Sequence, residues 1–199
     1  MNLRRIKMKF SIIMFSTLII LLGGLLLLGI NFTPNSVLPG KTEIIETYKT
    51  NDGLGLLYVD KVNDTFGIAD VKKLGPLYWY NGGSDSNKLT YDMPFKAAGY
   101  GGTNDEFMVG VRIPPGSKIK YFSLGNHLEE ADPLNDRITL EMIKQFPDRY
   151  HIKEVKGNYA FFLASGYSEN TWTLRGFDDK GKIVADKLFG SNPRFILTP

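Results

Sequence analysis

Few residues of this 199-residue chain could perform nucleophilic or metal chemistry. The chain has no cysteine, which excludes disulfides, thiolate zinc sites and cysteine nucleophiles. Its two histidines, His127 and His151, form no H-E-x-x-H or H-x-H motif and so predict no zinc site. Ser165 lies in a segment that lacks the first glycine of the G-x-S-x-G motif, and no phosphate-binding glycine motif occurs. The sequence therefore nominates no catalytic, metal-binding or cofactor-binding residue.

Acidic residues offer a second kind of chemistry. Glu129, Glu130, Asp132 and Asp136 lie close together, and Ca²⁺ takes several oxygen ligands, but a solvated charged loop is the favoured interpretation. Residues 178–181 lack the spacing of a calcium loop and predict a hairpin turn. The paired carboxylates of glycan hydrolases come from distant strands and leave no local motif. The 21 acidic residues therefore keep an envelope hydrolase as an alternative function.

Aromatic residues form a third group, which could contact a sugar ring or a peptide. Tyr and Trp combine apolar area with a polar group and are common at interfaces. Aromatic residues in strands mostly fill sheet faces, however, so packing within the fold is the favoured interpretation. The candidate interaction residues are Tyr78, Trp79, Tyr80, Tyr100, Tyr167 and Trp172.

The candidate residues lie after a long apolar run near the N-terminus. Residues 10–32 carry no charge, and 16 of these 23 residues are large and apolar. As a helix, the run would reach about 34 Å at about 1.5 Å per residue, enough for a hydrocarbon core of about 30 Å. A cleaved signal peptide has a shorter apolar region and an A-x-A-like cleavage site, which this segment lacks. We therefore expect an uncleaved transmembrane helix over residues 10–32.

The charges flanking this run are one-sided. Four of the 24 Lys and Arg residues precede it, without any acidic residue, and the remaining chain has 20 basic and 21 acidic residues. The positive-inside rule then predicts a cytoplasmic basic tip over residues 1–9 and an extracytoplasmic chain after the span. The near-neutral remainder offers no basic surface for nucleic acid, so no nucleic-acid partner is expected.

The segments next to the span differ in character. Residues 33–40 contain two prolines and no charge, which predicts a semi-extended stalk. Residues 42–48 have a capping residue and early acidic residues, which predicts a short helix. Residues 138–146 give a better helix signal, with Thr139 near the start and Pro147 as a stop.

The rest of the chain predicts strands. Apolar or alternating runs bounded by turn residues indicate strands at 54–60, 66–72, 77–80, 107–113, 118–124, 150–155, 159–164, 172–177 and 183–188. Because the helices do not alternate with the strands, the fold class is α+β: a transmembrane helix and then a mainly antiparallel β-rich domain over residues 41–199, with one or two short helices.

A Gly-, Ser- and Asn-rich stretch interrupts this pattern. Residues 81–105 hold little apolar mass, which predicts either a functional loop or a joint between two lobes. The lobes would then cover residues 41–83 and 106–190.

The overall layout has a known counterpart. A basic tip, a long anchor, hairpins within residues 54–71, the segment Trp79–Gly83 and a hairpin over Thr173–Ile183 resemble single-pass envelope proteins of low-GC Gram-positive bacteria. The resemblance implies a membrane-anchored extracytoplasmic protein and brings no activity or catalytic residues with it.

Together these observations favour a non-enzymatic binding or interaction module tethered to the cell membrane on its extracytoplasmic side. Its expected partners are the lipid bilayer, through residues 10–32, and an envelope protein or cell-wall component, with no cofactor. The alternative is a cell-envelope hydrolase that acts on wall glycan or peptide through a carboxylate pair.

Overall fold

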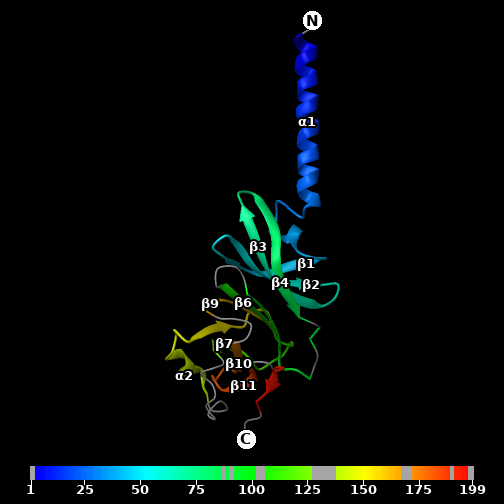
Figure 1. Ribbon diagram of the computed structural model, residues 1–199. Coiled ribbons are helices and arrows are strands. Elements are labelled where there is room, and N and C mark those ends of the chain that lie inside the picture. Colours follow the sequence, from blue (N-terminus) through cyan, green and yellow to red (C-terminus); the bar gives the residue numbers. More distant parts are fainter. Residues whose placement is uncertain are drawn as a thin grey trace.

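The computed structural model describes residues 3–86, 88–89, 92–101, 106–126, 138–166, 172–188 and 191–196. This part of the chain is a stack of three antiparallel β-sheets, with a long N-terminal helix that stands clear of them (Figure 1). The mainly antiparallel, β-rich domain expected from the sequence is therefore confirmed.

Sheet A is the layer next to the helix and is a four-stranded meander. Its strands, in spatial order, are β1 (Thr42–Lys49), β2 (Gly53–Asp60), β3 (Thr65–Leu74) and β4 (Leu77–Ser86). Short turns join each strand to the next, so the sequence order and the spatial order agree.

The short helix predicted over residues 42–48 is wrong, because this segment is strand β1, paired with β2. Its side chains alternate between half-buried and exposed along the whole strand. The β-branched residues and Tyr48 suit this half-buried surface, and the neighbouring strand supplies hydrogen bonds that outweigh a weak local helix preference.

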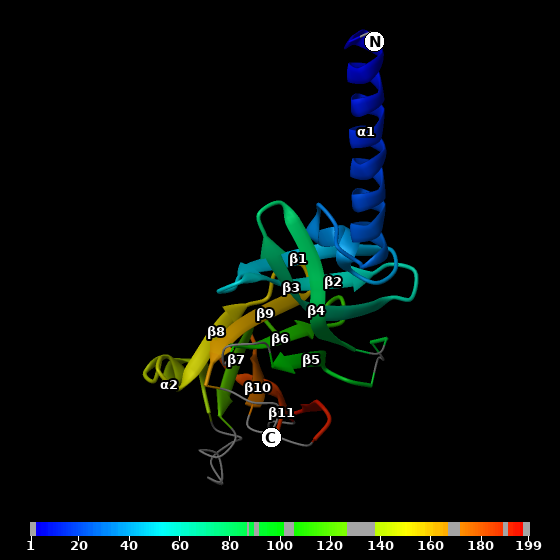
Figure 2. The ribbon, with the colours of Figure 1, turned by 45° about the horizontal axis from the view of Figure 1, so that its top comes forward.

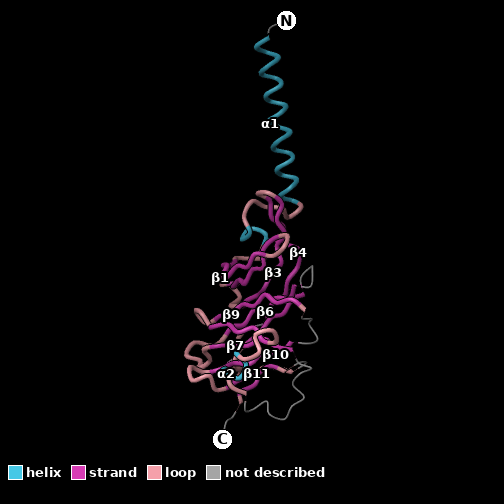
Figure 3. The backbone as a smooth tube through the Cα atoms, turned by 90° about the vertical axis from the view of Figure 1, so that its left-hand side faces the viewer, coloured by secondary structure: helices cyan, strands magenta, loops and turns pink. Residues whose placement is uncertain are grey.

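Sheet B is the middle layer, formed by β5 (Lys96–Gly101), β6 (Glu106–Arg112) and β9 (Tyr159–Ser165). One face shares a core with sheet A, where Met108 and Phe161 pack with Leu57 and Ile68. The other face shares a core with sheet C. Figure 3 shows β6 and β9 of sheet B between the strands of the other two sheets. Burial on both faces explains why β6 and β9 are nearly continuous apolar runs in the sequence.

A glycine lets sheets A and B approach closely. A Cβ atom on Gly110 would lie 2.8 Å from both Ile68 Cγ2 and Leu57 Cδ1. Contacts this short force the neighbouring side chains to move, so the spacing of the two sheets depends on the missing side chain.

Sheet C is the layer farthest from the helix (Figure 1). Its five strands, in spatial order, are β12 (Arg194–Phe195), β11 (Ile183–Lys187), β10 (Trp172–Phe177), β7 (Tyr121–Asn126) and β8 (Tyr150–Glu154). The predicted hairpin between β10 and β11 is present, with Gly181 at a φ of 75°.

The helix predicted over residues 138–146 is present as α2 (Leu140–Lys144), beside β8 in Figure 2. Thr139 caps it by accepting a hydrogen bond from the Met142 backbone N–H at 3.3 Å. Leu140 and Ile143 pack against Phe177 of sheet C, which anchors α2 to the outer face of that sheet.

The stretch predicted to be irregular, residues 81–105, contains strand in two of its described parts, since β4 continues to Ser86 and β5 spans Lys96–Gly101. Its glycines serve packing: a Cβ on Gly82 would overlap the Tyr100 hydroxyl, 1.9 Å away, and one on Gly83 would lie 2.8 Å from the Tyr80 hydroxyl. A glycine-rich composition predicts a loop. Here the glycines lie in strand β4, where the missing side chains leave space for aromatic rings.

The N-terminal helix α1 (Leu3–Leu27) has 25 residues. Counting only the residues that the structure describes, no helix is long and apolar enough to cross a membrane. The helix ends five residues before the expected Phe32 because Gly29 adopts a φ of 74° and forms a C-cap.

The segment expected to be a semi-extended stalk, residues 33–40, is folded onto the domain. It contains a 3₁₀ helix, η1 (Pro34–Val37), and the next residue, Leu38, is buried in a core with Leu56 and Val71 of sheet A. The apolar residues among its prolines find partners on the outer face of sheet A, so the segment packs instead of extending.

Candidate functional site

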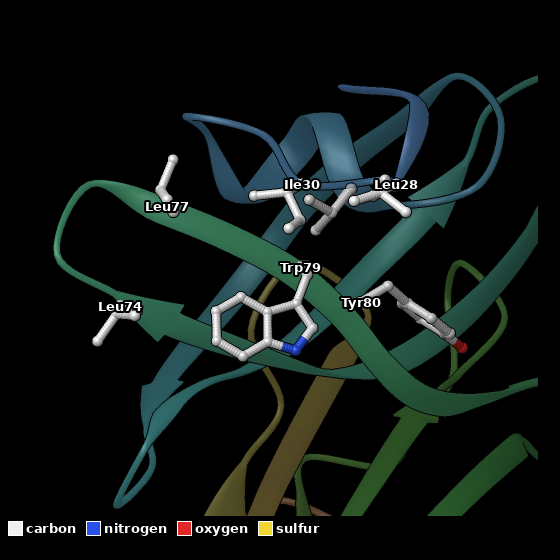
Figure 4. Close-up of a pocket in the computed structure, with 8 residues that line it drawn as sticks. Leu28, Ile30, Leu74, Leu77, Trp79 and Tyr80 are labelled. Carbon is white, nitrogen blue, oxygen red and sulfur yellow. The ribbon is translucent and has the colours of Figure 1, made fainter. Parts of the chain in front are cut away.

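A groove of about 670 Å³ lies between the end of α1 and strand β4 (Figure 4). In the close-up, Leu28 and Ile30 extend from the segment after the helix, while Trp79 and Tyr80 extend from β4. Apart from the Tyr80 hydroxyl and the Trp79 indole N–H, the lining side chains are apolar. The lining residues are Leu28, Gly29, Ile30, Val37, Leu74, Leu77, Trp79 and Tyr80.

One wall of this groove is formed by the C-terminal end of α1, where a hydrogen-bonded cap ends the helix. The Ile30 N–H donates to the Leu25 carbonyl at 3.0 Å, and the Gly29 N–H donates to the Leu26 carbonyl at 3.0 Å. With Gly29 in the left-handed conformation, these bonds make a Schellman motif, which turns the chain sharply out of the helix. Leu28 and Ile30 are thereby directed to the same end of sheet A.

A backbone bridge then fixes the helix end to β4. Asn31 N–H donates to the Tyr78 carbonyl at 2.9 Å, and Tyr78 N–H donates to the Asn31 carbonyl at 2.8 Å. This pair is a one-residue antiparallel pairing along the edge of sheet A. The two walls of the groove therefore cannot separate without breaking two hydrogen bonds.

Much of the groove's apolar lining is exposed. Leu28 is 76% exposed, Leu74 is 70% exposed and Tyr80 is 43% exposed, while Trp79 and Leu77 are half-buried. Exposed apolar surface that is contiguous, unlike scattered single residues, is typical of a binding surface.

The electrostatic surroundings of the groove are neutral to basic. Residues 71–84, which include the turn of the β3–β4 hairpin, contain no acidic residue, and Lys73 is exposed with its Nζ 5.3 Å from the centre of the Tyr78 ring. Burial and the neighbouring Tyr100 and Asp85 raise the pKa of Tyr80, so its phenol is neutral at physiological pH.

The adjoining Lys72 is held within the protein. Its Nζ lies 2.6 Å from Asp52 Oδ1 and 3.3 Å from Asp70 Oδ2, and Asp70 also accepts a hydrogen bond from Asn81 at 2.8 Å. Asp70 is 2% exposed. This network fastens the base of the β3–β4 hairpin to the turn between β1 and β2.

The structure describes five of the six aromatic residues nominated by the sequence, and it places them in different environments. Tyr78, Trp79 and Tyr80 lie together on β4, with Tyr78 packed on the outer core of sheet A. Tyr100 packs over Gly82, in the core between sheets A and B. Tyr167 lies outside the described residues.

Trp172 occupies a different environment from the β4 aromatic residues. It is only 7% exposed, in the core between sheets B and C, with its ring 6.0 Å from that of Phe107. The Lys187 Nζ lies 4.1 Å from the centre of the Trp172 ring. This arrangement matches the packing interpretation for Trp172.

Metal-ligating side chains do not cluster in the described part of the chain. Among those residues, no three His, Asp or Glu side chains are placed to hold a metal ion. His151 lies on β8, whereas His127 and the acidic group of Glu129, Glu130, Asp132 and Asp136 fall outside the described residues.

The two buried carboxylates of the described residues lie in different sheets, and each has a cationic partner. Asp70 of sheet A contacts Lys72, and Asp186 of sheet C accepts two hydrogen bonds from Arg194, at 2.8 and 3.1 Å. A glycan hydrolase needs two carboxylates across one cleft. These two do not form such a pair.

A second groove, of about 550 Å³, lies around the Pro114–Lys118 turn and β12. It is lined mainly by prolines and apolar residues, including Ile119, Val184 and Phe195. Its only charged lining residue is Lys118. Neither of these two grooves therefore contains an acidic side chain.

Comparison with known proteins finds no matching family model, no matching curated protein and no matching solved structure. The function must therefore be argued from the groove itself. The sequence identified the aromatic wall of the groove. It did not identify Leu28 and Ile30, because both were assigned to the expected transmembrane helix. The Gly29 that follows Leu28 is the signal that could have marked the helix end.

Proposed function

We propose that this protein is a membrane-tethered, non-enzymatic interaction module on the extracytoplasmic side of a cell membrane, with α1 as its anchor. The observation that carries the proposal is the uncovered apolar surface of α1. Every large apolar side chain from Ile12 to Leu22 is exposed, and Leu27 is 91% exposed.

An uncovered apolar helix requires an apolar environment, and a lipid bilayer provides one. A helix satisfies its own backbone hydrogen bonds where water is absent, so it is suited to that environment. In the sequence, the uncharged part of α1 runs from residue 10 to the end of the helix at Leu27, which is 18 residues. This length supports a span of the bilayer as opposed to a shallow contact.

The proposed orientation rests on charge. Arg4, Arg5, Lys7 and Lys9 precede the apolar run, and no charged residue follows it before Lys41. Positive flanks stay on the cytoplasmic side, so the three-sheet domain would lie outside the cell.

The proposed binding surface is the groove between α1 and β4. Its lining is apolar and aromatic, which suits recognition of an apolar ligand more than the chemistry of bond cleavage. The hydrolase alternative has no such support, because neither described groove brings an acidic side chain to its wall.

The tether can be tested by extraction. The full-length protein should remain with membranes after an alkaline carbonate wash, and the double variant Leu18→Arg, Leu22→Arg should be released, since each charge at the centre of a span costs about 2.5–3.5 kcal/mol. Val62→Arg, on an exposed turn of sheet A, is the matched control and should stay bound. Release of the unsubstituted protein would refute the tether.

A further inference from the structure

We infer that the β3–β4 hairpin is a second membrane contact, whose tip and groove take up lipid of the adjacent leaflet at the boundary between headgroups and acyl chains. The inference rests on the proposed role of α1 as an anchor. It names the ligand of the same groove: the bilayer that surrounds the anchor.

The first argument is position. Figures 1 and 2 both show the β3–β4 hairpin rising beside the base of α1. The two hydrogen bonds between Asn31 and Tyr78 hold the hairpin there. If α1 leaves the bilayer near Leu28, the hairpin tip lies at the membrane surface.

The second argument is the chemistry of the tip. Leu74 is 70% exposed, the turn residues Gly75 and Pro76 are exposed, and Leu77 is partly exposed. Behind this apolar tip are Trp79 and Tyr80, the residue types that favour the interface between headgroups and acyl chains. Apolar groups of surface-bound segments enter about 5–10 Å into this region. The tip therefore has the composition of a shallow membrane insertion.

The third argument is charge. Lys73 is exposed beside the tip, and a basic side chain there is attracted to anionic lipid. Asp52, on the neighbouring turn, would oppose this attraction, but its carboxylate is bound by Lys72 at 2.6 Å. The buried Asp70 shares the same lysine.

The fourth argument selects lipid over a protein partner. One wall of the groove is Leu28, Gly29 and Ile30, which are the last turn of the anchor and its cap. Any occupant must therefore touch the end of the anchor. The exposed apolar residues of α1 continue through Leu26 and Leu27 to Leu28 of this wall, so the molecules that cover α1 also reach the groove.

The chain has no cysteine, so an introduced cysteine carries the only label. The test uses the full-length protein in phosphatidylcholine vesicles with a minority of phosphatidylglycerol, and an environment-sensitive fluorophore at Leu74→Cys. Val62→Cys is the matched control, because Val62 is 69% exposed and lies beyond the opposite end of β3. Ile19→Cys reports on the anchor itself. Lipids carrying a nitroxide at a shallow or a deep acyl position serve as quenchers.

The expected result is that shallow nitroxides quench the label at residue 74 several-fold more than the label at residue 62, while deep nitroxides quench residue 19. If residue 19 is quenched and residue 74 behaves like residue 62, the lipid contact is refuted and the tether stands. If residue 74 is shielded from aqueous iodide but not quenched by lipid, a protein occupies the groove and the inference is wrong. If residue 19 is not quenched, both the tether and the inference fail.

Discussion

Asn31 and Tyr78 exchange two backbone hydrogen bonds, at 2.8 and 2.9 Å, although 46 residues separate them in the chain. This bridge joins the segment after α1 to the edge strand of sheet A. Together with the burial of Leu38, it holds the segment that the sequence predicted as a semi-extended stalk against sheet A. We therefore expect this bridge to restrain the orientation of the β-domain relative to the helix.

Removing one bond of this bridge should loosen the connection. Asn31→Pro deletes the N–H that donates to the Tyr78 carbonyl, at a cost of about 1 kcal/mol. Spin labels on α1 and on β1 should then give a broader distance distribution, with little change in the unfolding midpoint of the domain. Asn31→Ala keeps the N–H and should preserve the narrow distribution. An equally narrow distribution in the proline variant would show that the bridge does not fix the orientation.

Two adjacent lysines should differ sharply in their effect on stability. Lys72→Met leaves the nearly buried Asp70 without its cation and should cost about 2–4 kcal/mol in the free energy of unfolding, somewhat less than a fully buried pair. Lys73→Met changes an exposed side chain and should stay within about 0.5 kcal/mol. Chemical denaturation of the two variants would measure both values. Equal losses would contradict the proposed importance of the buried network.

The three sheets should unfold together, because sheet B shares one core with sheet A and another with sheet C. In Trp172→Phe, the remaining Trp79 reports on sheet A, while far-ultraviolet circular dichroism reports on all strands. The two signals should give the same denaturation midpoint. Separate midpoints would instead support two independent lobes, as the sequence allowed for residues 41–83 and 106–190.

Acidification should destabilise the domain through His151. Burial, and then the charge of Lys153, lower the pKa of His151 below its usual value of about 6.5. Between the lowered pKa and 6.5 the unfolded chain binds more protons than the folded protein, so stability falls as the pH drops through this window. His151→Gln should reduce the loss of stability between pH 7.5 and 5.5. An unchanged pH dependence in this variant would exclude His151 as its source.

The sequence predicted most strands correctly because turn residues bound them and their apolar patterns are strong. It failed at β1, where eight residues with early acidic side chains fit a helix as well as a strand, and pairing with β2 decides between them. It also failed at residues 82–83, where glycines make room for the rings of Tyr100 and Tyr80.

The candidate site was only partly predictable for a similar reason. Trp79 and Tyr80 were visible as an aromatic pair in a predicted strand. Leu28 and Ile30 were not, because the bridge between Asn31 and Tyr78 is made by backbone atoms and leaves no trace in side-chain pattern. Trp172 was grouped with the surface aromatic residues, and its burial depends on the contact of sheets B and C, which local sequence does not encode.

The most direct test of the tethered arrangement is the sidedness of the chain in intact cells. Single cysteines at Lys9 and at the exposed Lys180 can be probed with a membrane-impermeant maleimide. A tethered extracytoplasmic domain predicts labelling of Lys180→Cys in intact cells, and labelling of Lys9→Cys only after the membrane is opened. Labelling of Lys9→Cys together with protection of Lys180→Cys in intact cells would contradict the proposed orientation.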